Sequence, residues 1–402
     1  MDISILPGPL SGNIAAIPSK SAAHRALICA ALADGETKIY CPALSKDIEA
    51  TADCLRALGA GIDYREGSFF VSPIGTVRQG AMLNCGESGS TLRFLLPVVC
   101  ALGCEARIKM EGRLPQRPLS PLWEELEGHG ASLSRPEADM IAVSGRLRPG
   151  EYRMRADVSS QFISGLLFAL PLLDGDSSLE LSGSIESIGY IHMTERVQSL
   201  FSLELPFEGR RYKIAGSAAF RSPGELSVEG DWSNAAFWLT ASELSGGSVH
   251  VRGLDNSSAQ GDSAVIEALA KIRAGGAVID AKDIPDLVPV LAVAAAGSVG
   301  RTEFINAGRL RIKESDRIAS VCRMIKALDG DCTELAEGLI VNGCGKLRGG
   351  TVDGENDHRI VMSAAVAAII CKDPVTILGA QAAAKSYPGF FDDYRTLGGK
   401  TL

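Results

Sequence analysis

The sequence predicts an α/β (α+β) protein of two domains, each built from three copies of a βαβαββ unit. Its 402 residues exceed what one hydrophobic core usually organises. Six times along the chain, a polar loop with hydroxyl or carboxylate side chains leads into an apolar segment of helical length. A break or a Gly and then a β-rich run usually follow, and such self-similarity indicates a repeated supersecondary unit.

The six polar loops are spaced almost regularly. Counted from the first residue of one loop to that of the next, the separations are 69, 71, 72, 53 and 72 residues. This spacing predicts six units in all. The loops are Ser19–Ser21, Ser88–Ser90, Ser159–Gln161, Asp231–Ser233, Ile284–Asp286 and Asn356–His358.

Most units also contain a second helix and a hairpin. The second helix ends near a Gly, which suits the left-handed backbone conformation at a helix C-terminus. We expect such helices at 53–58, 122–126, 267–272 and 321–328. The β-rich runs that indicate hairpins are Gly61–Val71, Ala131–Val143 and Cys332–Val341.

The chain is expected to cross between its domains near Pro18 and Gly230. One domain then comprises residues 19–230, and the other comprises residues 1–18 plus 231–402. The N-terminal strand would complete the last unit of the second domain. A Gly-rich crossing at Gly230 also suits a hinge.

The polar loops have two interpretations. A helix N-terminus presents unpaired N–H groups and the positive end of a dipole, so it favours an anion. Alternatively, Ser and Asp at these positions serve only as N-caps, which is the more common role for any single loop.

Composition narrows the class of protein. Asp and Glu (48) outnumber Lys and Arg (40), which argues against a nucleic-acid-binding surface but not against a local basic site for an anionic ligand. The residues after Met1 lack the basic region and the long apolar region of a signal peptide, so none is expected. No apolar run is long enough to cross a bilayer. Ten scattered Cys and five scattered His predict free thiols in a reducing cytoplasm and no metal.

Two N-terminal loops carry groups suited to anion binding. Lys20 and Ser21 open an apolar helix, and Arg25 follows Ser21 by four residues on the same helical face. The second loop, Gly86–Arg93, is Gly-rich, so backbone N–H groups can approach a ligand, but it lacks the Lys-Ser/Thr pair of a Walker loop. Arg117 lies nearby, although an exposed Arg is the more common outcome.

Three further clusters lie towards the C-terminus. Asp286 precedes the apolar run Val288–Ala296, where partial burial would raise its pKa. Lys313–Arg317 places five polar residues at a helix start, Asp357–Arg359 opens another helix, and Lys385 follows. Each charged run alone is more often a solvated surface, but their recurrence at corresponding points of the repeat favours a site.

Together these motifs resemble the EPSP synthase family of 3-phosphoshikimate 1-carboxyvinyltransferases, in order and over essentially the whole chain. The resemblance implies an inside-out α/β barrel in two domains, with the active site in the interdomain cleft. It also implies transfer of the enolpyruvyl group of phosphoenolpyruvate to the 5-hydroxyl of shikimate 3-phosphate, with release of phosphate, in chorismate and aromatic amino acid biosynthesis. No cofactor, nucleic acid or membrane is needed, and a cytoplasmic monomer is expected.

The resemblance also implies roles for individual residues. Asp286 and Glu314, with a contribution from Lys20, would transfer protons, and Tyr190 would lie beside the substrate ring. The residues expected to bind shikimate 3-phosphate are Lys20, Ser21, Arg25, Ser159, Ser160, Gln161, Ser187, Asp286 and Lys313. Those expected to bind phosphoenolpyruvate are Lys20, Gly89, Arg117, Gln161, Arg317, Arg359 and Lys385.

The chain also departs from the family pattern. Glu87 and Ser88 stand where Asn and Ala are common, and Glu87 would be unfavourable near two anions unless it points away or pairs with an Arg. Two alternatives stay open at this point. One is the sister transferase acting on UDP-N-acetylglucosamine, although the reactive Cys of that family is missing from Arg113–Pro118. The other is a catalytically silent homologue that only binds metabolites.

Overall fold

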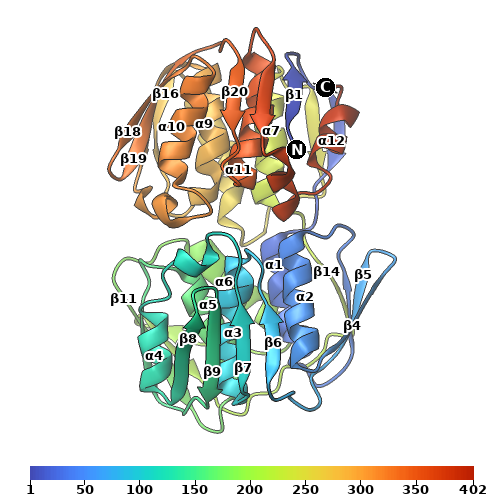
Figure 1. The fold of residues 1–402 in the computed structure, drawn as a ribbon, viewed down its shortest axis with the longest axis vertical. Coiled ribbons are helices and arrows are strands. Elements are labelled where there is room, and N and C mark those ends of the chain that lie inside the picture. The colour runs from blue at the N-terminus through green and yellow to red at the C-terminus, as the bar shows by residue number, and fades with distance from the viewer. The chain divides into compact units, whose positions relative to one another are not determined.

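The structure is a computed structural model that describes all 402 residues (Figure 1). The chain divides into two compact units. One unit is the continuous segment Lys20–Val228, and the other combines Met1–Ser19 with Glu229–Leu402. Each unit has a hydrophobic core of its own.

The segment Lys20–Val228 contains three sheets of four strands, each accompanied by two helices. The first sheet has the order β14-β3-β5-β4, so its outermost strand comes from the end of the segment. The elements of this first repeat are α1 (Lys20–Ala31), β3 (Thr37–Tyr40), α2 (Lys46–Leu58), β4 (Gly61–Arg65), β5 (Ser68–Ser72) and β14 (Glu225–Ser227).

The second and third repeats follow the order βαβαββ without interruption. The second contains β6 (Ala81–Asn84), α3 (Gly89–Leu102), β7 (Ala106–Lys109), α4 (Leu122–Gly128), β8 (Ala131–Glu137) and β9 (Met140–Gly145). The third contains β10 (Glu151–Arg155), α5 (Ser160–Ala169), β11 (Ser177–Ser182), α6 (Ile188–Leu200), β12 (Phe207–Glu208) and β13 (Arg211–Ile214). In both sheets the first two strands are parallel and the hairpin is antiparallel.

The other unit contains two complete repeats. One has β16 (Gly276–Asp280), α9 (Val288–Gly297), β17 (Val299–Ile305), α10 (Arg317–Ala327), β18 (Asp331–Leu335) and β19 (Gly338–Cys344). The other has β20 (Gly350–Asp353), α11 (His358–Ala367), β21 (Val375–Leu378), α12 (Phe390–Thr396) and β22 (Lys400–Thr401), and β1 (Ile3–Leu6) completes its sheet.

Six repeats are present, as predicted, but the fourth differs from the βαβαββ pattern because it lacks its hairpin. It consists of β2 (Gly12–Ala15), α7 (Trp232–Leu244), β15 (Val249–Arg252) and α8 (Val265–Arg273), and its sheet has only two strands. After α8 the chain enters β16 of the next repeat within three residues, so there is no hairpin. The missing hairpin explains why this repeat is 53 residues long where the others have about 70.

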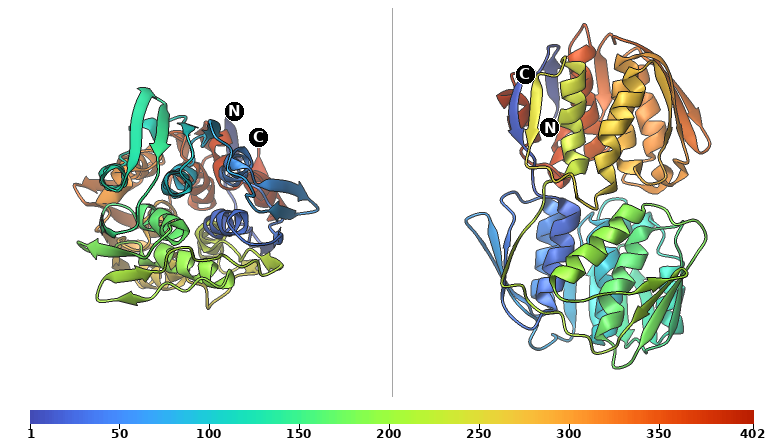
Figure 2. Two further views of the ribbon diagram at one scale, coloured as in Figure 1. Left: turned by 90° about the horizontal axis from the view of Figure 1, so that it is seen from below. Right: turned by 180° about the vertical axis from the view of Figure 1, so that it is seen from behind.

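Helices form the inside of each unit and sheets form the outside, as the inside-out architecture requires. Nearly every residue of α3 and α9 is buried, whereas β3 and β10 alternate buried and exposed residues along the strand. A helix that is apolar all round belongs in a core, and a strand with period-two alternation covers it with one face. Figure 2 shows helices enclosed by strands within Lys20–Val228.

The three predicted hairpins are confirmed as β4–β5, β8–β9 and β18–β19. The predicted second helices are likewise present as α2, α4, α8 and α10. Gly59 ends α2 at φ 119°, a left-handed conformation that L side chains rarely adopt. No helix is both long and apolar enough to pass through a bilayer.

The segments at which the chain passes between the units run side by side. Pro18 and Gly230 form an isolated antiparallel bridge, flanked by bonds from Ser19 N to Glu229 O and from Asp231 N to Ile17 O, both 2.8 Å. A Cβ at Gly230 would lie 2.3 Å from the carbonyl oxygen of Gly253. The crossing therefore requires Gly for close backbone approach.

Candidate active site

Four of the six polar loops cap a helix with a side chain. The acceptors and donors are Ser88 and Thr91 N (3.2 Å), Ser159 and Gln161 N (3.3 Å), Asp231 and Asn234 N (2.7 Å), and Asp357 and Arg359 N (2.9 Å). These four side chains therefore act as N-caps, and this role is compatible with an anion at the same helix start. Each cap satisfies one N–H group, which leaves other N–H groups of the first turn for a ligand.

Lys20 lies at the start of α1 beside the next helix. Its Nζ is 2.8 Å from Asp47 Oδ2 in the first turn of α2, and both side chains are largely buried. This ion pair fixes the position of the ammonium group relative to α2. Ser21, the next residue, is half-buried, and its carbonyl accepts a bond from Arg25.

Arg25 is only 2 % exposed and bonds to neutral oxygens alone. Its guanidinium donates to the carbonyls of Ser21 and Tyr190 (both 2.7 Å) and to Thr194 Oγ1 (2.8 Å). It also lies 4.9 Å from the ring centroid of Phe94, and burial lowers its pKa to about 10. A buried cation without a carboxylate partner gains strongly from an anionic ligand.

Gly89, the first residue of α3, lies against two guanidinium groups. A Cβ at this position would be 2.8 Å from Arg117 Nη1 and 3.0 Å from Arg93 Nη1. Arg93 Nη1 in turn donates to Gln161 Oε1 (2.8 Å), and Gln161 Nε2 donates to Ser90 Oγ (2.9 Å). The N-terminus of α3 therefore carries two cations and its own N–H groups in one place.

Hydroxyl groups of the third repeat lie at two more helix starts. Ser159 and Ser160 open α5, with Gln161 next to them. Ser187 precedes α6 in the left-handed conformation (φ 54°), which is uncommon for a residue other than Gly. Tyr190 follows in the first turn of α6.

The side chain of Glu87 lies against Gly112. Its carboxylate packs over the backbone of Gly112, where a Cβ would lie only 2.4 Å from Oε2. Gly112 has φ 57° and belongs to the turn that leads to Arg113. The Glu in this loop is therefore accommodated by a neighbouring Gly that has no side chain to displace.

In the other unit, Asp286 collects three cations. Its Oδ1 lies 2.7 Å from Arg317 Nη1 and 3.6 Å from Lys313 Nζ, and its Oδ2 lies 3.3 Å from Arg359 Nη2. Asp286 belongs to the short turn Pro285–Leu287 immediately before α9. The carboxylate of Asp286 therefore lies immediately before the N-terminus of the apolar helix α9.

The prediction that burial raises the pKa of Asp286 is wrong. Burial alone would raise it, but the opposing charges of Arg359, Lys313 and Arg317 hold the pKa of this carboxyl well below its usual range. For Lys313 the balance is different. Burial, the largest cause, lowers the pKa of its ammonium group to about 8 even though Asp286 opposes this shift.

Arg317 is buried at the start of α10 among three carboxylates. It bonds to Asp286 Oδ1 (2.7 Å), Glu314 Oε2 (2.6 Å) and Asp357 Oδ2 (2.8 Å). Burial opposes its charge, but Asp357, Glu314 and Asp286 together raise the pKa of the guanidinium. Arg317 is therefore a permanent cation that organises the carboxylates around it.

Asp357 connects two of the cationic helix starts. Besides holding Arg317 Nε, it caps α11 by accepting from Arg359 N, and it accepts from Ser315 Oγ at 3.0 Å. Arg359 itself donates to Ser233 Oγ (2.6 Å) and to the Asp286 carbonyl (2.8 Å).

Lys385 belongs to the same part of this unit. Its Nζ donates to the Asn356 carbonyl at 2.7 Å, one residue before Asp357. The neighbouring Ser386 accepts from Asn234 Nδ2 at 3.0 Å, which ties this segment to the first turn of α7.

The predicted residues divide into two groups according to the unit that contains them. Lys20, Ser21, Arg25, Gly89, Arg117, Ser159, Ser160, Gln161 and Ser187 belong to Lys20–Val228, and Asp286, Lys313, Glu314, Arg317, Arg359 and Lys385 belong to the other unit. Sequence reasoning missed Arg93 and the connecting role of Asp357. The spacing of four residues between Gly89 and Arg93 could have indicated the first.

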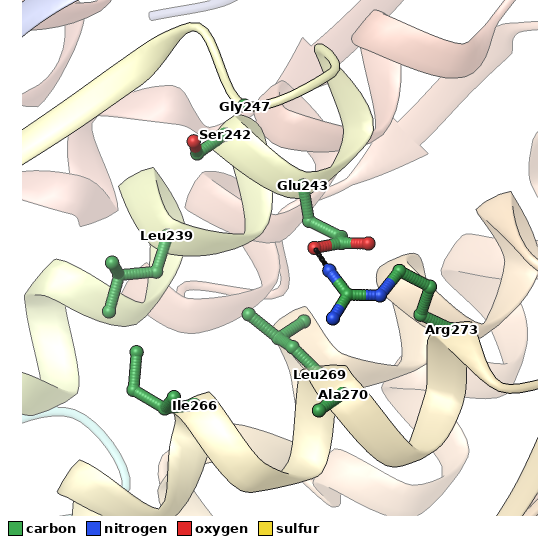
Figure 3. A pocket seen from close by; sticks show the side chains of 8 residues that line it. All are labelled: Leu239, Ser242, Glu243, Gly247, Ile266, Leu269, Ala270 and Arg273. Atoms are coloured by element: carbon green, nitrogen blue, oxygen red, sulfur yellow. Dashed lines mark hydrogen bonds and ion pairs between the residues drawn. The ribbon is translucent and has the colours of Figure 1, made fainter.

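A separate pocket carries none of these residues. It lies between α7 and α8 of the incomplete fourth repeat and is lined mainly by apolar side chains (Figure 3). Arg273 and Glu243 form an ion pair of 3.0 Å at its edge, and Ile266 is 54 % exposed nearby. This pocket is distinct from both groups of candidate residues.

The N-termini of several helices on this repeated α/β scaffold carry cations, hydroxyls and carboxylates. This arrangement defines an enzyme for small anionic metabolites. The family model for EPSP synthase (3-phosphoshikimate 1-carboxyvinyltransferase) matches residues 6–394. The chain belongs to this family.

Individual relatives agree with this assignment. A 3-phosphoshikimate 1-carboxyvinyltransferase from Clostridium kluyveri is 38 % identical, covering 99 % of this chain and 97 % of that protein. The protein of the same name from Clostridium acetobutylicum is 39 % identical, again covering 99 % and 97 %. The solved EPSP synthase of Acinetobacter baumannii shares the fold, with a TM-score of 0.83, 24 % identity and coverage of 100 % and 99 %.

Proposed function

We propose that this 3-phosphoshikimate 1-carboxyvinyltransferase applies both groups of residues to one pair of substrates, shikimate 3-phosphate and phosphoenolpyruvate. The observation that carries the proposal is that the two groups contain different kinds of side chain. The group in Lys20–Val228 offers cations, hydroxyls and helix N–H groups but no carboxylate among the predicted residues. The other group supplies cations together with Asp286 and Glu314.

Shikimate 3-phosphate would be held chiefly by the first group. Ser159, Ser160 and Ser187, all at helix starts, would bind its 3-phosphate, with Lys20 and Gln161 nearby. Its carboxylate would receive bonds from Ser21 and from the buried Arg25, whose charge has no protein counter-ion. Lys313 and Asp286 would bind the ring hydroxyls. A polar ring thus gains both charge-assisted and neutral hydrogen bonds.

Phosphoenolpyruvate would be held at both of its charged ends. Lys20, Gly89, Arg117, Gln161 and Lys385 would bind its phosphate, and Arg93 joins them because it lies against Gly89. Arg317 and Arg359 would take its carboxylate. The bidentate geometry of a guanidinium group suits a carboxylate better than an ammonium group does.

The ion pairs of Asp286 suggest how substrate binding prepares the chemistry. Arg317 and Arg359 hold this carboxylate at 2.7 and 3.3 Å and keep its pKa well below its usual range, so it is a weak base. A substrate carboxylate that takes these two guanidinium groups would compete with Asp286 for them. The pKa of Asp286 would then rise towards the range in which it can accept a proton.

The reaction requires proton transfers in both of its steps. The 5-hydroxyl of shikimate 3-phosphate loses a proton as its oxygen attacks C2 of phosphoenolpyruvate, and the methylene carbon gains a proton. This step yields a tetrahedral ketal phosphate. Loss of a methyl proton and departure of phosphate then form the enolpyruvyl ether. Asp286 and Glu314 would exchange these protons, while the cations stabilise the developing charge and the leaving phosphate.

The proposal is tested by phosphate release from phosphoenolpyruvate and shikimate 3-phosphate with purified protein. Release should require both substrates, and omission of shikimate 3-phosphate is the control. Asp286→Asn should lower kcat strongly while the protein still binds shikimate 3-phosphate. No phosphate release by the unaltered protein, or an unchanged kcat in Asp286→Asn, would contradict the proposal.

Three further expectations accompany this function. It stays a prediction that the two groups of residues meet around the substrates in an interdomain cleft. A cytoplasmic location and a monomeric state also stay predictions. Sedimentation of the purified chain at a mass near 42.2 kDa would support the last of these.

A further inference from the structure

A buried chain of polar side chains connects the first three helices of Lys20–Val228. His24 Nδ1 lies 2.7 Å from Thr51 Oγ1, and Thr51 Oγ1 lies 2.7 Å from Thr91 Oγ1. Thr91 Oγ1 donates to Ser88 Oγ at 2.7 Å. The four side chains come from α1, α2, the first turn of α3 and its N-cap, and all are buried.

The hydrogen-bond directions along this chain are fixed from its end at Ser88. Thr91 donates its single hydroxyl hydrogen to Ser88 at 2.7 Å, whereas the Asp47 carbonyl is at 3.5 Å and Thr51 Oγ1, at 2.7 Å, can itself act as the donor to Thr91. Thr91 must therefore accept from Thr51, and Thr51 must accept from His24. The Nδ1 atom of His24 carries the proton.

The other ring nitrogen of His24 is consistent with this tautomer. Nε2 is buried without a hydrogen-bond partner, so an N–H group there would be left unsatisfied. Burial, followed by the charges of Lys20 and Arg25, holds the pKa of His24 well below its usual range. His24 is therefore neutral, with one N–H group to donate.

The same three helices carry residues proposed to bind phosphoenolpyruvate. Lys20 is one turn before His24 in α1 and pairs with Asp47, which is one turn before Thr51 in α2. Ser88 immediately precedes Gly89, the residue flanked by Arg93 and Arg117. Helix α2 thus contacts α1 through Asp47 and Thr51. Thr51 also contacts Thr91 at the start of α3.

We propose that His24 is a positioning residue, which acts through Thr51 and Thr91 to hold the Ser88–Gly89 turn in register with Lys20. This inference rests on the proposed function, because it assumes that Lys20 and Gly89 bind the phosphate of phosphoenolpyruvate. Loss of the chain lets the N-terminus of α3 move relative to α1. Phosphoenolpyruvate is then bound less well, whereas the four side chains of this chain include none of the serines proposed to bind the 3-phosphate of shikimate 3-phosphate.

The first test compares variants that change one donor at a time. Thr51→Val and Thr91→Val keep the side-chain shape and remove the hydroxyl. Each should raise KM for phosphoenolpyruvate about tenfold, the effect of one buried hydrogen bond, with KM for shikimate 3-phosphate changed less than about twofold. Thr240→Val is the matched control, because Thr240 in α7 is buried and its hydroxyl has no partner.

His24 itself is tested with a pair of variants. His24→Leu should raise KM for phosphoenolpyruvate as the Thr variants do, while His24→Asn, whose amide can donate to Thr51, should restore most of the loss. A purely space-filling role for His24 would leave both variants equally impaired, and that result would overturn the proposal. Equal increases in both KM values would also overturn it.

A direct measurement does not depend on any variant. The ¹⁵N shifts of His24 in the whole protein should show the Nδ1–H tautomer, with a pKa well below the usual range of a histidine. The Nε2–H tautomer would overturn the proposed hydrogen-bond directions. Failure of the proposed function is distinguishable, because the unaltered protein would then release no phosphate from the two substrates at all.

Discussion

At the scale of single residues, the candidate chemistry depends on how charges are paired. Asp286 is surrounded by Arg317, Arg359 and Lys313, so its charge is stabilised and its basicity is low. Arg25, by contrast, is a buried cation among neutral oxygens. An anionic ligand would compete with Asp286 for its cationic partners. The same kind of ligand would supply the counter-charge that Arg25 lacks.

Glu314 is expected to be needed for turnover more than for binding. Its Oε2 lies 2.6 Å from Arg317, so Glu314→Gln retains a hydrogen-bonding side chain of nearly the same shape but removes the proton-transferring carboxylate. We expect kcat to fall by at least about a hundredfold, the usual effect of losing a general acid or base. Steady-state kinetics with calorimetric binding of shikimate 3-phosphate would check this. An unchanged kcat would remove Glu314 from the mechanism.

Lys313 should give the reaction a pH dependence on its alkaline side. Its ammonium group has a pKa of about 8, mainly because it is buried, and its side chain is still 23 % exposed. The charged form binds an anionic substrate better, so affinity is full below pH 8 and is lost as the pH rises through that value. The profile of kcat/KM for shikimate 3-phosphate reports this free-enzyme pKa.

The matched control for Lys313 is Lys313→Arg, whose charge persists at every accessible pH. In this variant the decrease near pH 8 should disappear from the profile, even if the absolute activity is lower. A decrease that persists at the same pH in Lys313→Arg would assign it to another group.

At the scale of elements, the starts of helices set the positions of the functional groups. Four N-caps, Ser88, Ser159, Asp231 and Asp357, fix where α3, α5, α7 and α11 begin. Because each repeat places its helix start at the corresponding point, cations and hydroxyls recur there. The element therefore determines position, and the side chain next to the cap determines the chemistry.

Gly89→Ala tests the start of α3. The added Cβ would lie 2.8 Å from Arg117 Nη1 and 3.0 Å from Arg93 Nη1, so at least one guanidinium group must shift. We expect KM for phosphoenolpyruvate to rise, with little change in the thermal unfolding temperature, because long side chains can move. Gly128→Ala, with open space around the added carbon, is the control. Equal kinetics in both variants would show that Gly89 is not near the phosphate.

At the scale of the whole molecule, two separate cores carry the fold. Every residue of the first core lies within 20–228, and that segment is continuous. The other unit is discontinuous, since β1 pairs with β21 and β22, and β2 pairs with β15. The units should therefore differ in their ability to fold alone.

A fragment comprising residues 20–228 is expected to fold by itself, because it contains all three of its sheets, including β14 beside β3. It should unfold cooperatively but release no phosphate, since Asp286 and Glu314 are absent. Circular dichroism during thermal unfolding would check this. The matched fragment 229–402 should be much less stable because it lacks β1 and β2, and a non-cooperative 20–228 fragment would contradict the expectation.

The sequence alone determined the repeat, the class of fold and most of the candidate residues. Regular spacing, Gly at helix ends and period-two strands are local signals, because each arises from backbone geometry within one unit. Residue types at the helix starts, such as Lys313–Arg317, were likewise visible without coordinates.

Only the tertiary structure decided which groups lie together. It showed that the fourth repeat lacks a hairpin, that Arg93 adjoins Gly89, and that the pKa of Asp286 is lowered where apolar flanking sequence suggested the reverse. Each of these depends on neighbours distant in the chain. Burial and the Coulomb interaction depend on distance in space, which the order of residues does not specify.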